Sequence, residues 1–426
     1  MAAAWLLDKS HNITVYEQNN YVGGHSNTVS ANIDNAVISV DTGFIVYNEK
    51  NYPNLTALFN LLKVPTVDSE MSFSASLEDG GFEYSGTNLN GLIGQRRNIF
   101  RPRFWRMLRD INRFYKEAPS LLKTNADTSL TLDEFLKRNH YCDSFINDHL
   151  MPMGAAIWSA TVNEMKNYPA VAFIRFFESH GLLNIKNRPR WRTVNGGSKV
   201  YVKKLTENYK KKIRFEKATS IVRTLEGVEI EAANNGVHFY DHVVIATHAD
   251  EAFSLLKDPS ESEVKLLSKW RYSKNKAILH KDSRFMPKRK RVWSSWNFIE
   301  NYNADSNQKI CLTYWMNKLQ NIETPTPLFV TLNPTIEMDP HSVISEHEYT
   351  HPYFDDQALK SQKNLWAIQG VKKTWFCGSY FGYGFHEDGL QSGLAVAEEL
   401  GGIKRPWDVA SENARITVPI SSRITE

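Results

Sequence analysis

The stretch ITVYEQNNYVGGHSNTV, residues 13–29, decides the fold class of this chain. Its apolar run from Ile13 to Glu17 predicts a buried strand that ends on an acidic residue. A carboxylate in that position can accept hydrogen bonds from both hydroxyls of a ribose. Six residues later, Gly23-Gly24 permits the backbone to approach a pyrophosphate, which the hydroxyl of Thr28 can also reach. The stretch therefore predicts part of a Rossmann-type nucleotide-binding unit.

The composition limits the number of domains and the classes of partner that the chain can have. A chain of 426 residues with 42% hydrophobic residues can bury a large core in two or three domains. The net charge of +4 is too small to imply a nucleic acid partner. The three cysteines lie far apart with no CxxC pair, which argues against a disulfide framework and against a metal site. Mean hydropathy is -0.44 and no apolar run reaches about 18 residues, so we expect a cytoplasmic protein.

Apolar runs that end in turns alternate with helical patterns, which favours an α/β or α+β class. Helices are expected at residues 54–62, 131–138 and 169–180. Residues 212–247 alternate as a β-meander that ends in the apolar strand HVVIAT, and strands dominate again from 276 to 332. The closing segment predicts a strand, a Gly-rich loop and a helix that ends at Gly401-Gly402, followed by a loosely held tail, residues 405–426.

Five motifs in a fixed order resemble the FAD-dependent flavoproteins related to amine oxidases, phytoene desaturases and protoporphyrinogen oxidase. They are VYEQNNYVGGHSNTV (15–29), VDTGF (40–44), NGGSKVYVKKL (195–205), DHVVIATHAD (241–250) and FCGSYFGYGFHEDGLQSGLAVAEEL (376–400). The chain is most similar to the bacterial branch known as predicted NAD/FAD-binding amine-oxidase-like proteins. The resemblance covers nearly the whole chain. It implies a Rossmann-like FAD-binding domain from residues 1–50, 190–265 and 370–405, an inserted α+β substrate domain from 51–189 and 266–369, and a tail, 406–426.

The resemblance also implies which residues contact FAD. Gly378 would let the backbone approach the cofactor, and the helix that opens at Gly389 would aim its positive end at the flavin, with Asp388 as N-cap. Two positions depart from the family pattern: Ser379 stands where a carboxylate is common, and His25 where an arginine is common. The implied FAD contacts are Glu17, Gly23, Gly24, His25, Thr28, Asp41, Gly43, Val222, Gly378, Ser379, Asp388, Gly389 and Leu390.

Two side chains are candidates for proton transfer. By resemblance to amine oxidases, Lys276 aligns with a lysine that holds a water near flavin N5, where a dry pocket would lower its pKa. An exposed lysine on a strand edge is the alternative. His386 lies in the loop that faces the flavin, and we prefer it to His280. Cys377 ends a strand, where a small buried side chain is expected more than a covalent flavin link.

The residues before the opening stretch pose a question of their own. AAAWLL reads as the end of the first Rossmann helix, with an alanine face packed closely on the sheet. The strand and GxGxxG turn that normally precede such a helix, roughly 15 to 20 residues, are absent. We therefore predict that the true start lies upstream and that this form binds FAD poorly or not at all.

Two further features bear on the substrate. Eight aromatic residues, together with MGAAIWSA (153–160), predict an apolar pocket for a hydrophobic substrate. They are Trp293, Trp296, Tyr314, Trp315, Tyr380, Phe381, Tyr383 and Phe385. Half of these eight are expected to be ordinary core residues. Segment 96–116 interleaves arginines with aromatic residues. It predicts either a core helix with a solvated basic side or a helix that lies on the inner face of an anionic membrane.

Taken together, these features predict an FAD-dependent oxidoreductase that transfers a hydride between a hydrophobic substrate and flavin N5. Lipid and isoprenoid-like substrates rank above amines because of the basic aromatic helix. The alternative is a flavin-free homologue that acts as a binding or scaffold protein, suggested by the absent first turn. An NAD-dependent dehydrogenase is disfavoured, because the C-terminal Gly-rich segment would have no role there. The oligomeric state is left open.

Overall fold

A computed structural model describes residues 1–123, 130–158, 160–184, 188–300, 311–410 and 412–418. The expected tail beyond residue 418 lies outside these ranges. The mixed α/β class agrees with the prediction. The helices are α1 (Ala2–Leu7), α2 (Pro53–Leu61), α3 (Leu89–Leu92), α4 (Pro102–Glu117), α5 (Leu132–Arg138), α6 (Asp143–Phe145), α7 (Met151–Trp158), α8 (Val162–Lys166), α9 (Ala170–Ser179), α10 (Lys199–Thr206), α11 (Ala249–Leu255), α12 (Glu261–Leu267), α13 (Met316–Leu319), α14 (Asp356–Gln362) and α15 (His386–Gly401).

The strands complete the inventory of regular structure. They are β1 (Val15–Tyr16), β2 (Thr28–Ile33), β3 (Ala36–Asp41), β4 (Tyr47–Asn48), β5 (Thr66–Ser69), β6 (Phe73–Leu77), β7 (Phe82–Ser85), β8 (Trp191–Val194), β9 (Ile213–Arg214), β10 (Ala218–Arg223), β11 (Val228–Ala232), β12 (Gly236–Tyr240), β13 (Val243–Ile245), β14 (Arg271–His280), β15 (Trp296–Ile299), β16 (Cys311–Trp315), β17 (Phe329–Leu332), β18 (Val343–Tyr353) and β19 (Thr374–Phe376).

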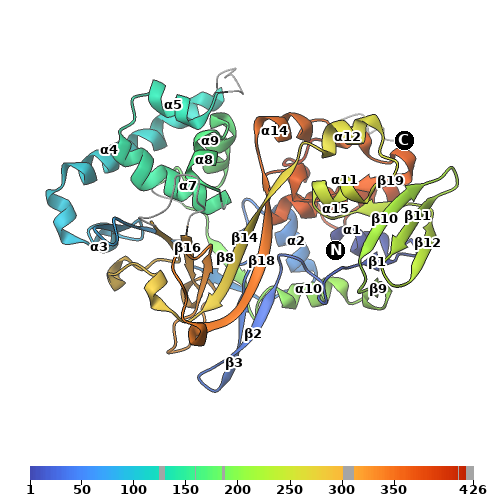
Figure 1. Cartoon of the computed structure of the whole chain (residues 1–426), viewed down its shortest axis with the longest axis horizontal. Helices are drawn as coiled ribbons and strands as arrows, with labels where there is room; N and C mark the ends of the chain where they lie inside the picture. The colour runs from blue at the N-terminus through green and yellow to red at the C-terminus, as the bar shows by residue number, and fades with distance from the viewer. Residues whose placement is uncertain (124–129, 159, 185–187, 301–310, 411, 419–426) are drawn as a thin grey trace.

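A seven-stranded sheet forms the centre of the molecule, in the order β18-β14-β17-β16-β15-β6-β7. Its pairs are antiparallel except for β15 and β6, which run parallel. Figure 1 shows the long strands β14 and β18 between a helical lobe at the left, with α4, α5, α7 and α9, and a lobe at the right that holds α15 and the sheet β10-β11-β12. The N-terminus lies at the right-hand lobe, beside α1 and α15.

Short parallel sheets build the nucleotide-binding side of this second lobe. Strand β1 pairs with β9, and β13 pairs with β19. Helix α1 packs against α15, where a Cβ added at Gly393 would lie 3.4 Å from the Cβ of Ala2. The alanines of α1 were expected to face the sheet, and the structure places them on this neighbouring helix instead. No strand of the described residues joins the two parallel pairs. The expectation of a further strand ahead of Met1 stays a prediction.

The sequence patterns located three helices within one residue of their ends. Helices α2, α5 and α9 match the three expected helices, and Thr131 caps α5 by accepting the backbone N–H of Glu134.

The expectation of a loose tail was wrong for its described part. Arg405 is buried and pairs with Glu398, and the ring of Trp407 stacks on that of Trp5. Polar residues dominate the tail, but the carboxylates of Glu398 and Asp388 on α15 pair with Arg405 and Arg415.

Candidate functional site

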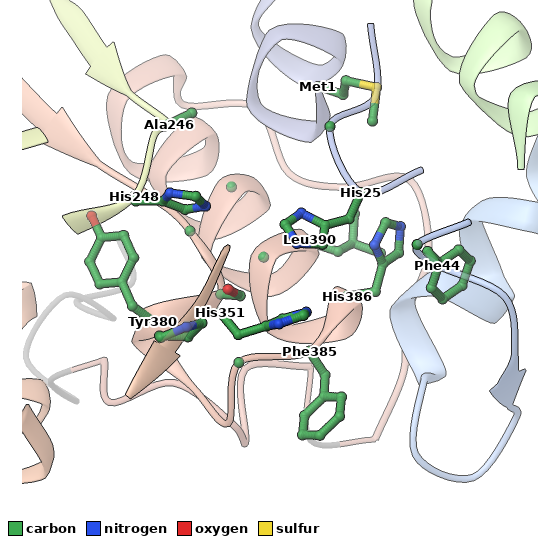
Figure 2. A pocket seen from close by; sticks show the side chains of 18 of the residues that line it. Met1, His25, Phe44, Ala246, His248, His351, Tyr380, Phe385, His386 and Leu390 are labelled. Atoms are coloured by element: carbon green, nitrogen blue, oxygen red, sulfur yellow. The ribbon is translucent and has the colours of Figure 1, made fainter. Parts of the chain in front are cut away.

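A single cavity of about 1500 Å³ extends from the parallel strands of the nucleotide-binding lobe to the helices α4, α7 and α9. Its walls include α1, β1, the Gly23-Gly24 turn and the start of α15. Figure 2 shows this region, where His25, His248, His351 and His386 surround the space next to Leu390. The volume exceeds the usual range for one small ligand, roughly 300 to 1,000 Å³, and suits a large cofactor together with a substrate.

The glycine turn after β1 has the conformation that its sequence predicts. Gly23 and Gly24 have φ angles of +131° and +57°. A Cβ added at Gly24 would meet no atom within 4 Å, and this residue lines the cavity. Its backbone is therefore free to approach a ligand. Glu17, at the end of β1, also lines the cavity, as a ribose-binding carboxylate should.

Gly43 has a different reason to be glycine. The N–H of Phe44 donates to the carbonyl of His25 over 2.6 Å, which brings two chain segments together at the cavity wall. A Cβ added at Gly43 would lie only 2.2 Å from that carbonyl oxygen. Gly43 thus places His25 and Phe44 on the cavity surface by close backbone packing.

His25 presents an unpartnered nitrogen in the cavity. Among the described residues its buried Nε2 atom has no hydrogen-bond partner. The ring lies 5.0 Å from that of Tyr349 and 5.3 Å from that of His351, measured between centroids. Burial, and to a smaller extent neighbouring His248, lowers the pKa of His25 to about 4. The ring is therefore neutral near pH 7, and its free nitrogen can pair with a polar group of a bound ligand.

His386 begins α15 and is also held neutral. Its ring stacks on Phe44 with centroids 4.0 Å apart, and its Nε2 atom lies 2.7 Å from the hydroxyl of Tyr201. Burial lowers the pKa of His386 to about 3. The structure thus brings the preferred proton-transfer candidate to the cavity wall, as a neutral imidazole that can donate or accept one hydrogen bond.

Helix α15 begins two residues earlier than its predicted cap. Asp388 was expected as the N-cap, but it is the third residue of the helix and is fully buried. Its carboxylate accepts the N–H of Phe385 over 2.7 Å and pairs with Arg415. Asp388 does not line the cavity, whereas Gly378, Ser379, Gly389 and Leu390 do. The positive end of α15 therefore reaches the cavity through its backbone.

Asp41 and Thr28 are bound to other protein groups, contrary to the sequence-based expectation. The Thr28 hydroxyl donates to Asp41 over 2.6 Å, and Asp41 also accepts the N–H of Ser198 over 2.9 Å. The side-chain amide of Gln320 donates to Asp41 as well. Neither Asp41 nor Thr28 lines the cavity. Their role is structural, because they fix the Gly-rich start of α10 to the hairpin β2-β3.

Lys276 and Val222 were also wrong as site residues. Lys276 of β14 pairs with Glu346 over 2.9 Å, and about half of its side chain is exposed. The alternative reading of an exposed strand lysine is correct. Val222 is absent from the cavity wall and is exposed, whereas its neighbour Ile221 lines the cavity. His280 is fully buried outside the cavity and bonds Thr331. At Val222 strand alternation turns the side chain away, whereas Lys276 shares its strand face with Tyr272, which lines the cavity, but lies beyond the cavity wall.

A comparison with known protein families identifies the family of this chain and the cofactor of its cavity. A family model described as flavin containing amine oxidoreductase matches residues 1–348. The chain belongs to the flavin-containing amine oxidoreductase family. Its cofactor is FAD, and it is an FAD-dependent oxidoreductase. The architecture is accordingly a Rossmann-like FAD-binding part combined with a substrate domain.

Solved structures agree on the fold at low sequence identity. Putrescine oxidase bound to putrescine has a TM-score of 0.65 at 13% identity, covering 94% of this chain and 96% of that one. Cyclohexylamine oxidase from Brevibacterium oxydans has a TM-score of 0.64 at 14% identity, covering 94% of this chain and 96% of that one. A fatty acid isomerase from P. acnes has a TM-score of 0.62 at 13% identity, covering 92% of this chain and 94% of that one. Among curated proteins no relative is matched.

The residues present fit FAD. The open turn at Gly23-Gly24, the unpartnered His25 nitrogen and the backbone of Gly378 and Gly389 line one cavity, next to Glu17. A second unpartnered polar atom, the buried hydroxyl of Tyr380, lies in the same wall. Glu17 and the glycine turn would hold the ribose and pyrophosphate, and the start of α15 would face the flavin.

Several wall residues were missed by sequence reasoning. His248 comes three residues after the end of β13, and that position, a polar residue in the turn at the carboxyl end of a parallel strand, is a usable signal. The others come from elements far apart in the chain and carry no local signal: Tyr84, His149, Phe176, His180, Arg188 and His351. The expected aromatic wall is partly correct. Trp296, Tyr314, Tyr380, Tyr383 and Phe385 line the cavity, whereas Trp293, Trp315 and Phe381 do not.

Proposed function

We propose that this oxidoreductase transfers a hydride between an elongated hydrophobic substrate, lipid or isoprenoid-like, and the N5 position of FAD. When bound, FAD supplies the redox chemistry by accepting or returning the hydride. The observation that carries the choice of substrate is the lining of the cavity beyond the nucleotide-binding lobe.

The substrate end of the cavity is apolar and aromatic. Leu108, Ile111 and Tyr115 come from α4, and Met153 and Ile157 come from α7. Large aromatic side chains complete this part of the wall, namely Trp158 at the end of α7 and, from other elements, Phe176, Trp191, Trp296 and Tyr314. Such walls exclude water and favour long apolar substrates over sugars and nucleotides.

The charge of this chamber argues against a protonated amine. Between Met71 and Trp191, the described residues of the cavity wall include no aspartate or glutamate. Arg188 is the permanent cation among them, and its charge reaches both Tyr115 and His149. Burial, and then Arg188, lowers the pKa of His149 to about 4. A cationic substrate would lose its hydration without a counter-charge, whereas a neutral or carboxylate-bearing chain would not.

Residues of the chain prepare the site in other ways. The backbone N–H groups at the start of α15 favour negative charge beside the cavity, which matches the needs of a reduced flavin. His386 is kept neutral by burial and is held in place by Tyr201 and Phe44, so it can orient a polar group without adding charge. Among similar structures, the fatty acid isomerase is named for a hydrophobic acid and the two oxidases for amines. The lining of this chain favours the first kind of substrate.

The test measures reduction of bound flavin. The chain reconstituted with FAD is mixed anaerobically with long-chain fatty acids, isoprenoids or aliphatic amines, and flavin absorbance is followed. We expect bleaching with lipid-like compounds only. Because a hydrogen bond to a charged group contributes about 1.5 to 3 kcal/mol, Arg188→Met is expected to weaken binding of a fatty acid about tenfold or more. Arg190→Met is the matched control, since the exposed Arg190 is not part of the cavity wall.

Two results would contradict the proposal. Bleaching by amines but not by lipid-like compounds would overturn the substrate class. A folded chain that shows no flavin absorbance at any FAD concentration would instead support the flavin-free binding protein, the alternative indicated by the sequence.

A further inference from the structure

One end of the helical lobe exposes large apolar side chains. Leu89 of α3 is 79% exposed, Phe100 at the end of the 3-10 helix η1 (Arg96–Phe100) is 87% exposed, and Trp105 of α4 is 53% exposed. The indole N–H of Trp105 donates to the carbonyl of Ile99 over 2.8 Å, which holds the ring against η1. Figure 1 shows α3 and α4 at the left edge of the molecule, away from the nucleotide-binding lobe. These side chains therefore form a protruding apolar edge.

Basic residues surround this edge. Arg96, Arg97, Arg106, Arg109 and Lys116 are all exposed. Among the described residues no salt bridge involves Arg96, Arg97, Arg106 or Lys116. Arg109 contacts Asp110, but that carboxylate is fully buried, so the guanidinium remains on the surface. The surface that comprises Leu89, Arg96, Arg97, Ile99, Phe100, Trp105, Arg106, Arg109 and Lys116, here named the basic aromatic edge, thus carries a largely uncompensated positive charge.

The neighbouring side of α4 faces the cavity, since Leu108 lies one turn after Trp105. Leu108, Ile111 and Tyr115 line the substrate chamber, as does Leu92 of α3. A helix is about 10 to 12 Å in diameter, so the basic aromatic edge lies within about one helix thickness of the chamber. Within the described residues no helix is both long and apolar enough to cross a bilayer. Any membrane contact of this edge would therefore be interfacial.

We propose that the basic aromatic edge docks on an anionic lipid bilayer. Phe100 and Trp105 insert at the boundary between headgroups and acyl chains, and the arginines bind the lipid phosphates. Arginine and tryptophan suit this depth, because each joins an apolar body to a polar end. Exposed apolar side chains among exposed arginines fit a soft anionic lipid surface. The docked pose places the wall of the substrate chamber directly against the source of a lipid substrate.

The experiment measures sedimentation with lipid vesicles and needs no redox activity. The full chain is mixed with vesicles of phosphatidylcholine, with or without phosphatidylglycerol, and the bound fraction is determined by centrifugation. We expect binding to the anionic vesicles that falls steeply with added salt. Since each arginine near such a surface contributes about fivefold to binding, Arg96→Gln/Arg97→Gln/Arg106→Gln is expected to lower affinity about a hundredfold.

Matched variants distinguish binding through the basic aromatic edge from nonspecific hydrophobic binding to vesicles. Phe100→Ser/Trp105→Ser is expected to lower affinity at least about tenfold. Val237→Ser/Phe239→Ser removes comparably exposed apolar side chains from β12, on the other lobe, and should leave binding unchanged. Circular dichroism verifies that each variant is folded.

Three outcomes would overturn the proposal. They are equal binding to neutral vesicles, an equal loss in the β12 control, and absence of vesicle binding by the folded chain. If an acidic polypeptide binds in place of the vesicles, the edge is a protein-docking surface and the lipid assignment is wrong. Vesicle binding without any flavin reduction by lipids would retain this proposal and overturn only the proposed substrate.

Discussion

At the residue scale, buried neutral histidines couple the stability of this protein to pH. His280 shows the effect outside the cavity. Its Nδ1 atom accepts the N–H of Asp282 over 3.0 Å, so its Nε2–H donates to Thr331 over 2.7 Å. Burial lowers the pKa of His280 from 6.5 to about 4. Protonation would break this arrangement.

The sign of the pH effect follows from linkage. Between about pH 6.5 and pH 4 the unfolded chain binds the proton and the folded chain does not. The contribution of His280 is therefore complete above pH 6.5 and is lost as the pH falls towards 4, about 3 kcal/mol in all. In urea unfolding measured across this range, His280→Gln should flatten the decline in the free energy of unfolding. The exposed His341→Gln should not, and an equal effect of both variants would refute the assignment.

Lys276 gives a contrasting prediction. Because its ion pair with Glu346 is half exposed, Lys276→Met should change the free energy of unfolding by less than about 0.5 kcal/mol. The side chain lies outside the cavity wall, so FAD affinity should also be unchanged. Denaturant unfolding and a flavin titration measure the two quantities. A marked loss of FAD affinity in Lys276→Met would show that Lys276 belongs to the cofactor site after all.

At the element scale, two glycines of one wall should respond differently to alanine. In Gly43→Ala the new Cβ would collide with the carbonyl of His25, so the backbone must shift and stability should fall by about 2 kcal/mol or more. In Gly24→Ala the Cβ has space but the φ angle is positive, which costs about 1 kcal/mol. Because that Cβ lines the cavity, Gly24→Ala should weaken FAD binding more than it weakens folding. If the loss of FAD affinity relative to the loss of unfolding free energy were the same in both variants, this distinction would be wrong.

The start of α15 supplies a test of buried charge. Asp388 is fully buried and Arg415 nearly so, and they pair over 3.3 Å. Asp388→Ala would leave the arginine without its carboxylate, which should cost about 3 to 5 kcal/mol in unfolding free energy. Asp356→Ala at the start of α14 is the control. Its pair with Lys360 is exposed, and its loss should cost less than about 1 kcal/mol. Similar losses at both helices would show that Arg415 finds another partner.

At the scale of the whole molecule, one cavity joins the nucleotide-binding lobe to the helical lobe. FAD bound there contacts only the folded state, so it should raise the thermal midpoint in a concentration-dependent way. The gain is about 2.7 kcal/mol at a hundredfold excess over Kd. Scanning calorimetry over an FAD series measures it, with Gly24→Ala expected to require more FAD for the same rise. A midpoint independent of FAD would contradict the assigned cavity and agree with the sequence-based prediction that this form binds FAD poorly or not at all.

The sequence by itself determined the family, the cofactor and the local elements, because these depend on short-range patterns. Gly23-Gly24 requires positive φ angles, Thr131 caps a helix three residues later, and the Gly-rich C-terminal motif specifies a strand followed by a helix. Such features are encoded within a few neighbouring residues. The ends of α2, α5 and α9 and the meander could therefore be predicted closely.

Only the tertiary structure decided which side chains reach the cavity. Asp41 and Thr28 bear the right chemistry but bind Ser198, more than 150 residues away in the chain. Lys276 shares the strand face of Tyr272 but lies beyond the cavity wall, while His351, Arg188 and His149 come to the cavity from separate elements. One residue of register on a strand reverses the direction of a side chain, and the local pattern did not specify that register here. The chemistry of the site therefore depends on long-range packing that brings distant segments together.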